Sequence, residues 1–310
     1  MAAYTTFTRE ALIGYVRMFG IGDLESFEPI TEGIENSNYF VTIIKHDTKR
    51  EYVLSIIEQL GLEELSFFSQ ILQRLSLSGI PVPMPKRTLD GMTSTIFCGK
   101  PTLLTPRLKG MHVQDPSTEQ CQILGKTLAT IHLNLSTEEC FRENPYSPDW
   151  MEMTITENTE ELSSSDLTML NEITKDYRVA QNKDLPSGII HGDLFRDNVL
   201  FKANEVMAIL DFFNACNDFW LQDIAIAIND WCVNKNGGLV KSRGDAFLDG
   251  YSEVRALEEE ELKNLIKYRI FSAARLALTR QKRDKSGAHL KDPEEYLNLT
   301  RQLYQYDYER

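Results

Sequence analysis

Cysteine, positive charge and long apolar runs are all scarce in this chain of 310 residues. Its five cysteines are odd in number, widely spaced and without a C-x-x-C pair, which argues against a disulfide framework or a zinc site and predicts reduced, buried thiols. Lys and Arg number 33 against 46 Asp and Glu, so the net charge of −13 disfavours nucleic acid or an anionic membrane as a partner. With no signal peptide and no run that could span a bilayer, a cytoplasmic protein is expected.

Several catalytic motifs are missing as well. The chain has no G-x-S-x-G, no H-E-x-x-H, no P-loop and no G-x-G-x-x-G after a strand, so hydrolase, zinc protease, P-loop and dinucleotide-binding functions lack their residues. The histidines show no metal-ligand spacing, and His132, which shares a helix face with Leu128 and Leu135, is expected to pack in a core. The hydrophobic content of 42% and the length are those of an ordinary globular chain of about two domains.

The hydrophobic pattern changes after the first third of the chain. Before that point the spacing predicts a helix, a β-hairpin, a second helix and another hairpin, over 8–20, 37–44 with 51–57, 61–79, and 93–97 with 102–105. Beyond it the chain reads as mainly helical, interrupted only by a hairpin, with helices expected over 117–135, 157–180, 222–234, 258–282 and 294–306 and the hairpin at 199–201 and 206–210. We therefore expect an α+β chain of two lobes: a small antiparallel sheet lobe with one helix over 1–105 and a larger α-helical lobe over 106–310, with a hinge at about 103–110.

The stretch IIHGDLFRDNVLF at 189–201, followed by AILDF at 208–212, carries most of the chemistry. A loop with a carboxylate at Asp193 and an amide at Asn198, and a hairpin that returns Asp211, brings hard oxygen ligands together. Magnesium binds through one or two carboxylates plus substrate phosphates, so Asn198 and Asp211 are candidate ligands and Asp193 is left to act as a base. Phosphoryl transfer needs little beyond such positioning and charge neutralisation.

This constellation resembles the catalytic and metal loops of the aminoglycoside phosphotransferase and choline kinase group, which are relatives of the protein kinases. The resemblance implies that Asp193 is the catalytic base and that Asn198 and Asp211 hold Mg²⁺. It makes His191 a supporting residue and gives Asp223, in LQDIA at 221–225, the role of a helix aspartate that braces the catalytic loop. The alternative for Asp223 is a surface residue at the start of a helix.

The same resemblance places ATP in the first lobe. The segment TEGIENSN at 31–38 corresponds to the loop that covers the phosphates, and 103–108 corresponds to the hinge that meets the adenine. The residues that the resemblance assigns to nucleotide binding are Gly33, Asn36, Ser37, Asn38, Ser55, Leu104 and Thr105.

Ser55 departs from the general pattern of the group. It occupies the strand position where protein kinases and many aminoglycoside kinases have the lysine that pairs with the α- and β-phosphates. A hydroxyl cannot replace a cation, so Lys45 and Arg107 are the candidate substitutes. Glu64, on the next helix, corresponds to the usual partner of that lysine and is expected to be only a surface charge.

Within the group the resemblance narrows to the homoserine kinases of the phosphotransferase-like type. Five segments over nearly the full length carry it: GIENSNY at 33–39, YVL at 52–54, GIPVP at 79–83, HGDLFRDN at 191–198 and INDWC at 228–232. It implies ATP-dependent phosphorylation of the hydroxyl of L-homoserine, on the route to threonine, with Mg²⁺. A zwitterionic acceptor needs a carboxylate or carbonyl groups for its ammonium and an arginine fork or N–H groups for its carboxylate, and we expect Asp230 and Arg275 to supply them. The alternative for Arg275 is a structural ion pair.

Two other functions stay open. Another small-molecule kinase of the group, acting on choline, ethanolamine, an aminoglycoside, methylthioribose or a sugar, would use the same site. A nucleotide-binding pseudoenzyme or partner-binding module is suggested by Ser55 alone. In the kinase cases the expected partners are small molecules, ATP and an acceptor.

Overall fold

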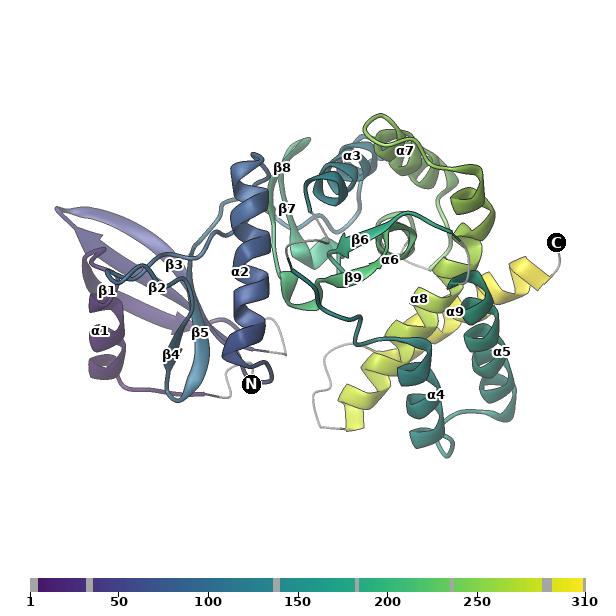
Figure 1. Cartoon of the computed structure of the whole chain (residues 1–310), viewed down its shortest axis with the longest axis horizontal. Coiled ribbons are helices and arrows are strands. Elements are labelled where there is room, and N and C mark those ends of the chain that lie inside the picture. The colour runs from purple at the N-terminus through teal and green to yellow at the C-terminus, as the bar shows by residue number, and fades with distance from the viewer. Residues whose placement is uncertain are drawn as a thin grey trace. The chain divides into compact units, whose positions relative to one another are not determined.

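The computed structural model describes residues 5–31, 36–135, 140–181, 184–234, 237–285 and 292–308. The chain divides into two compact units (Figure 1). The first comprises Met1–Gly110 together with Met207–Leu210, and the second comprises Met111–Val206 and Asp211–Arg310. The first continuous stretch therefore ends at Gly110, the last residue of the hinge expected from the sequence. Residues 207–210 join this unit, where the Ile209 amide donates to the Pro81 carbonyl at 2.8 Å.

The first unit is built on a five-stranded antiparallel sheet in the order β1-β2-β3-β5-β4. Its strands are β1 (Asp23–Pro29), β2 (Ser37–Lys45), β3 (Thr48–Ile56), β4 (Thr95–Phe97) and β5 (Lys100–Pro106). Strands β2 and β3 form a hairpin closed by two residues, His46 and Asp47, whose φ angles of 49° and 61° suit a tight turn. Two helices accompany the sheet, α1 (Arg9–Arg17) and α2 (Leu62–Leu77).

Buried and less buried residues alternate along the central strands and show which face of the sheet is covered. Tyr52, Leu54 and Ile56 are buried in a cluster that includes Leu12 and Val16 of α1. The residues between them on β3 lie on the opposite face, because successive strand residues point to opposite sides. Thr8 is the N-cap of helix α1, and its hydroxyl accepts the Ala11 amide at 3.2 Å.

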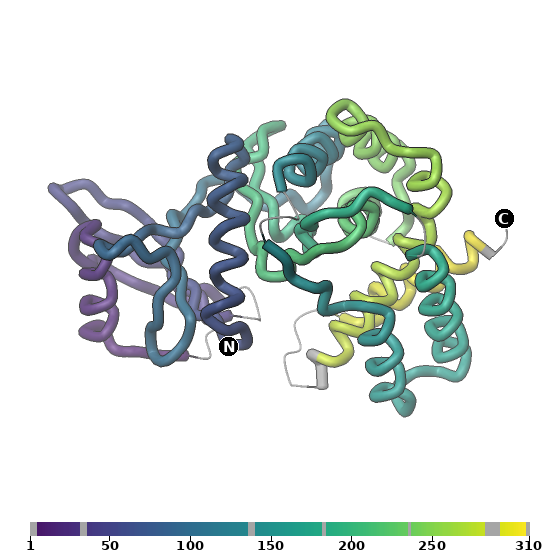
Figure 2. Tube along the Cα trace, viewed as in Figure 1, coloured from purple at the N-terminus to yellow at the C-terminus, as the bar shows by residue number. Residues whose placement is uncertain are grey.

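The second unit is mainly helical, and its path from α3 to the yellow α9 can be followed in Figure 2. Its helices are α3 (Thr118–Asn134), α4 (Pro148–Glu157), α5 (Ser164–Gln181), α6 (Trp220–Trp231), α7 (Lys241–Ser252), α8 (Glu259–Lys285) and α9 (Pro293–Tyr308). Two small sheets complete the strands, with β6 (Ser187–Ile190) beside β9 (Cys216–Phe219) and β7 (Val199–Lys202) beside β8 (Glu205–Ile209). The central helix is α6, of which every residue from Leu221 to Trp231 is buried.

The α+β, two-lobed fold expected from the sequence is confirmed. Several details differ. The helix expected over 157–180 is wrong at its start, because α4 ends at Glu157 and α5 begins only at Ser164. The hairpin of β7 and β8 is not the only β-structure after the hinge, since β6 and β9 also pair. Strand β1 and helices α4 and α7 are additional elements that the pattern did not indicate. Within the described ranges, none of the helices combines the length and the apolar character that crossing a membrane requires.

Candidate active site

The loop from His191 to Asn198 links strand β6 to β7 and ends in a short 3-10 turn at Arg196–Asn198. Hydrogen bonds within the loop itself help to hold its shape. The Asp193 amide donates to Nδ1 of His191 at 3.2 Å, the Phe195 amide donates to the Asp193 carbonyl at 2.8 Å, and the Asn198 amide donates to the Phe195 carbonyl at 2.9 Å. The loop is therefore a compact turn that presents Asp193 at its bend.

Asn198 contacts the predicted base directly. Its side-chain nitrogen donates to the backbone carbonyl of Asp193 at 2.8 Å and to Oδ2 of the Asp193 carboxylate at 3.1 Å. These two bonds fix the orientation of the Asn198 amide and leave its Oδ1 as the acceptor atom for a ligand. The predicted base and one predicted metal ligand are thus parts of a single hydrogen-bonded turn.

Asp211 follows β8 in a left-handed backbone conformation, with a φ of 58°. Its Oδ1 is buried and has no hydrogen-bond partner among the described residues. Burial raises the pKa of Asp211, opposed by the nearby His191. A buried carboxylate oxygen without a partner is costly unless a cation or a donor occupies its position. These features fit a hard divalent cation.

The described residues offer no cluster of three or more His, Cys, Asp or Glu side chains that could hold a metal without help. A magnesium ion does not need such a cluster, because it keeps waters and binds substrate phosphates alongside one or two protein oxygens. The Oδ1 atoms of Asp211 and Asn198 are oxygens of that kind.

Asp223, in the first turn of α6, anchors the beginning of the loop. Its carboxylate accepts the amides of His191 at 2.7 Å and Gly192 at 2.9 Å, and it contacts Nε2 of His132 at 3.1 Å. Burial alone would raise the pKa of Asp223, but the hydrogen bonds and charges around it outweigh burial and lower it. Asp223 is fully buried and is no surface cap. His132 is equally buried, bonds the Tyr251 hydroxyl at 2.7 Å, and has its pKa lowered by burial.

The last turn of α6 holds the middle of the loop. Nε1 of Trp231 donates to the Leu194 carbonyl at 3.1 Å. Asp230 accepts three bonds from Arg196: Oδ2 takes the backbone amide at 2.7 Å and Nε at 3.1 Å, and Oδ1 takes Nη2 at 3.1 Å. Both oxygens of Asp230 are thus engaged inside the protein, an arrangement that differs from the predicted role as ligand of the acceptor ammonium.

Arg275, on α8, reaches the same loop from another side. It is 3% exposed, and its Nη2 donates to the Gly192 carbonyl at 3.1 Å. Its guanidinium lies 4.7 Å from the centre of the Tyr146 ring, and no salt bridge of Arg275 is found among the described residues. Burial raises the pKa of Asp218 to about 6, and the charge of Arg275 partly opposes that shift. Nε of Arg275 is buried without a hydrogen-bond partner in the part of the chain that the structure describes. The structural ion pair considered for Arg275 is therefore absent among these residues.

Arg275 lines a small cavity behind the loop together with Gly192, Tyr146 and Asn214. The cavity measures about 10 Å³, room for about one water molecule. The Tyr146 hydroxyl donates to Oδ1 of Asn214 at 3.4 Å, and burial raises the pKa of Tyr146. Sequence reasoning missed Tyr146 and Asn214, because neither belongs to a motif and only the fold brings them to Arg275.

Of the residues assigned to the nucleotide in the first unit, Gly33 lies outside the described residues. Ser37 is fully buried, and its hydroxyl donates to Oε1 of Glu58 at 2.6 Å while it accepts the Thr5 amide at 2.9 Å. Oδ1 of Asn36 accepts the Glu58 amide at 3.3 Å. Both side chains thus bond within the protein.

Asn38 and Ser55 differ from Asn36 and Ser37 in their position, because they are directly paired residues of strands β2 and β3. Directly paired strand residues share a face, and this face is opposite the one that packs on α1. Leu104 and Thr105 lie within β5, where the Leu104 carbonyl accepts the Lys86 amide at 2.8 Å. The pair of Asn38 and Ser55 is therefore the part of the predicted nucleotide site with side chains most open to a ligand.

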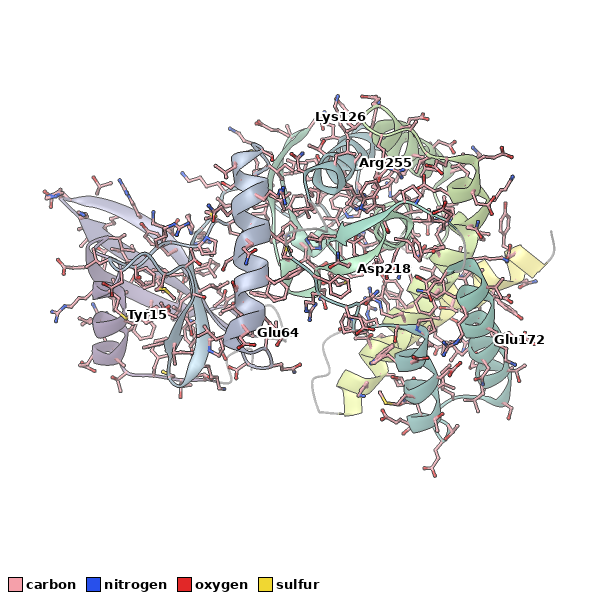
Figure 3. All side chains as sticks on the ribbon, in the orientation of Figure 1. Tyr15, Glu64, Lys126, Glu172, Asp218 and Arg255 are labelled. Carbon is pink, nitrogen blue, oxygen red and sulfur yellow. The ribbon has the colours of Figure 1, made fainter. Side chains whose placement is uncertain are left out.

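The candidate substitutes for the missing lysine have other partners. Nζ of Lys45 donates to the Gly20 carbonyl at 3.0 Å, and Arg107 pairs with Glu51 at 3.1 Å. Glu64 lies in the first turn of α2 (Figure 3), where Oε2 accepts the Gly61 amide at 3.0 Å and so caps the helix. Glu64 has a structural role. The contacts of Lys45 and Arg107 are with other protein groups and do not support a role for either residue in binding the phosphates.

Comparisons with known proteins agree with this geometry. A homoserine kinase of Agrobacterium fabrum is 36% identical over 97% of this chain and 95% of its own length. A homoserine kinase of Neisseria meningitidis serogroup B is 36% identical over 84% of both chains. Among solved structures, an amicoumacin kinase in complex with AMP-PNP and Ca²⁺ superposes with a TM-score of 0.74 at 16% identity, over 97% of this chain and 94% of that one. The spectinomycin phosphotransferase APH(9)-Ia gives 0.68 at 15% identity, over 98% of both chains, so both structures share the fold.

The family model described as "Phosphotransferase enzyme family" matches residues 26–257, a range that begins within β1 and contains strands β2 to β5, the loop at 191–198 and helix α6. With that match and the full-length relatives, the chain belongs to the phosphotransferase enzyme family.

Proposed function

We propose that the protein transfers the γ-phosphoryl group of ATP to the hydroxyl of L-homoserine, giving O-phospho-L-homoserine and ADP. The observation that carries the proposal is the turn in which Asn198 orients Asp193, anchored by Asp223. The homoserine kinases that match most of the chain at 33% to 36% identity support this acceptor.

In the proposed reaction the hydroxyl oxygen of the acceptor forms a bond to the γ-phosphorus while the bond from that phosphorus to the bridging oxygen breaks. Asp193 accepts the hydroxyl proton, and its carboxylate is fixed for this task by Nδ2 of Asn198 at 3.1 Å. The backbone amides bonded to Asp223 hold the loop in place, so that the base needs little reorganisation. Asn38 and Ser55 are the proposed polar contacts for the nucleotide.

We further propose that the divalent cation is Mg²⁺ and that Asp211 and Asn198 hold it. Bound there with the nucleotide, it would neutralise charge on the phosphates. The unpartnered Oδ1 of Asp211 is the observation that supports the assignment. Turnover measured in EDTA and then with Mg²⁺, Mn²⁺ or Ca²⁺ restored tests the choice of ion, and turnover that survives EDTA would contradict it.

The two residues predicted for the acceptor have unequal support. Arg275 keeps an unpartnered Nε, so we retain it as the proposed ligand of the acceptor carboxylate. Asp230 is not retained, because Arg196 engages both of its oxygens.

The test is ADP release with Mg²⁺ and ATP across L-homoserine, D-homoserine, L-serine, choline, methylthioribose and kanamycin. We expect turnover with L-homoserine alone, and Asp193→Asn should lower kcat by at least about 10²-fold with a modest change in nucleotide affinity. The matched control is Asp245→Asn, which removes an exposed carboxylate paired with Lys241 on α7.

Each other outcome has a defined meaning. A different preferred acceptor would overturn the homoserine assignment while the base survives. Normal turnover in Asp193→Asn would remove Asp193 from its role. The absence of ADP release with every acceptor would indicate a pseudoenzyme.

A further inference from the structure

Helix α6 contacts the catalytic loop at two positions along its axis, near its start and near its end. Asp223 and Asp230 are seven residues apart, which is close to two helical turns, so their side chains leave the same face about 10 Å apart along the axis. Asp223 takes the first two amides of the loop. Asp230 accepts bonds from the amide and guanidinium of Arg196, and Nε1 of the adjacent Trp231 donates to the Leu194 carbonyl.

Asp193 lies between these two anchored parts of the loop. Gly192 precedes it and is bonded to Asp223, while Leu194 follows it and is bonded to Trp231. Three residues beyond Asp193, Arg196 is bonded to Asp230 through three donors. The loop therefore cannot shift along α6 without breaking bonds on both sides of the base.

The ion pair is complete within the protein. Nε and Nη2 of Arg196 donate to the two carboxylate oxygens of Asp230. The remaining nitrogen, Nη1, donates to the Gln114 carbonyl at 2.7 Å. The Asp230 side chain is 12% exposed and that of Arg196 is 27% exposed. An acceptor ammonium would have to displace Arg196 in order to reach Asp230.

We propose that Asp230 and Arg196 form a positioning pair that holds Asp193 in its catalytic orientation, and that Asp230 does not bind the acceptor. The proposal rests on the function proposed above. Breaking the pair frees the segment between Asp193 and Asn198, and misplacement of a reacting group by about 1 Å costs on the order of 10²-fold in rate. The loss falls on kcat, because the groups that bind the acceptor are not removed.

Steady-state kinetics of Asp230→Asn, Arg196→Gln and the double variant test the pair. We expect each single variant to lower kcat by about 10- to 100-fold, with KM for L-homoserine within about twofold, and the double variant to lose no more than the worse single one. Arg196→Lys keeps the charge without the fork and should recover part of kcat. Asp245→Asn serves again as the control and should match the wild type.

Three kinetic outcomes would overturn the proposal. A large rise in KM for L-homoserine with kcat retained in Asp230→Asn would make Asp230 an acceptor ligand. Losses that multiply in the double variant would show that the two residues act separately. An unchanged kcat in both single variants would show that the pair does nothing for the loop.

Hydrogen exchange separates this proposal from the function on which it rests. In Asp230→Asn, the peptide covering residues 191–198 should exchange faster than in the wild type, while peptides from α4 and α5 stay unchanged, which also shows that the variant is folded. If the wild type fails to phosphorylate homoserine, the proposed function fails, but the exchange result still decides the role of the pair. Unchanged exchange in the loop would refute the pair whichever acceptor is used.

Discussion

The substitution Asp223→Asn tests the anchor at the start of the catalytic loop. An asparagine has one acceptor oxygen where the aspartate has two, and its amide nitrogen must then face a donor. The least costly orientation keeps the oxygen toward the His191 amide and His132, at 2.7 and 3.1 Å, and turns the nitrogen toward the Gly192 amide. The Gly192 N–H is left without an acceptor and faces a second donor, the new side-chain amide, and the two remaining bonds lose their charge.

The magnitude follows from those changes. An unsatisfied buried N–H costs about 1–3 kcal/mol, and losing the charge weakens each remaining bond by about 1 kcal/mol. The sum, roughly 3–5 kcal/mol, agrees with the usual cost of breaking a buried charged interaction. Urea unfolding at pH 7 measures it, and kcat measured where the variant is still folded should fall as well. The control is Asp149→Asn, an exposed pair with Arg178 that should cost at most about 1 kcal/mol.

A loss of less than about 1 kcal/mol in Asp223→Asn, with kcat unchanged, would refute this reasoning. It would mean that the loop keeps its shape without the carboxylate, and that the bonds at 2.7 and 2.9 Å do not determine it.

Three more predictions follow. Gly125→Ala should destabilise the protein by about 1–3 kcal/mol or more in urea, because its Cβ would lie 2.0 Å from the Phe247 carbonyl oxygen of α7, whereas Gly14→Ala meets nothing within 4 Å and should stabilise by about 0.5–1 kcal/mol. Burial lowers the pKa of His132 below 6.5, so between pH 7 and 5 the unfolded chain binds more protons and the free energy of unfolding should fall, less steeply in His132→Gln. Asp211→Asn should raise the Mg²⁺ concentration for half-maximal ADP release about 10-fold or more.

Each of these has a contrary result. Equal stability of the Gly125 and Gly14 variants would show that α3 and α7 can separate freely. A parallel pH dependence of unfolding in the wild type and His132→Gln would remove His132 as a cause. An unchanged Mg²⁺ titration in Asp211→Asn would contradict its role as a ligand.

The periodic parts of the fold could be predicted from the sequence, and the irregular parts could not. The hairpin of β2 and β3 and the helix α2 have clear periods of two and 3.6 residues. Strands β6 and β9 have four residues each, too short for a period to show. Helix α7 was missed because its glycines weaken the helical signal, yet Gly250 is where the backbone of α3 comes close: a Cβ there would lie 2.0 Å from the Gln122 carbonyl oxygen.

The same division applies to the site. Asp193, Asn198 and Asp211 could be proposed from the sequence because their chemistry is local, within one loop and one hairpin. The partners of Asp230 and Arg275 depend on which helices pack together, and no spacing in the sequence reveals that Arg196 reaches α6 or that Arg275 reaches the Gly192 carbonyl. The sequence shows that Asp230 and Arg275 carry charge, but it does not show which groups they contact in the folded protein.

The dependence of the catalytic loop on α6 also bears on the order of folding. The bonds that anchor the loop join residues 31 to 37 positions apart along the chain, and the bond from Arg275 spans 83. Such contacts close long loops and form only after the helices they join have docked. We therefore expect the loop at 191–198 to acquire its shape late in folding, and to lose that shape if either end of α6 frays while most of the helical unit is still intact.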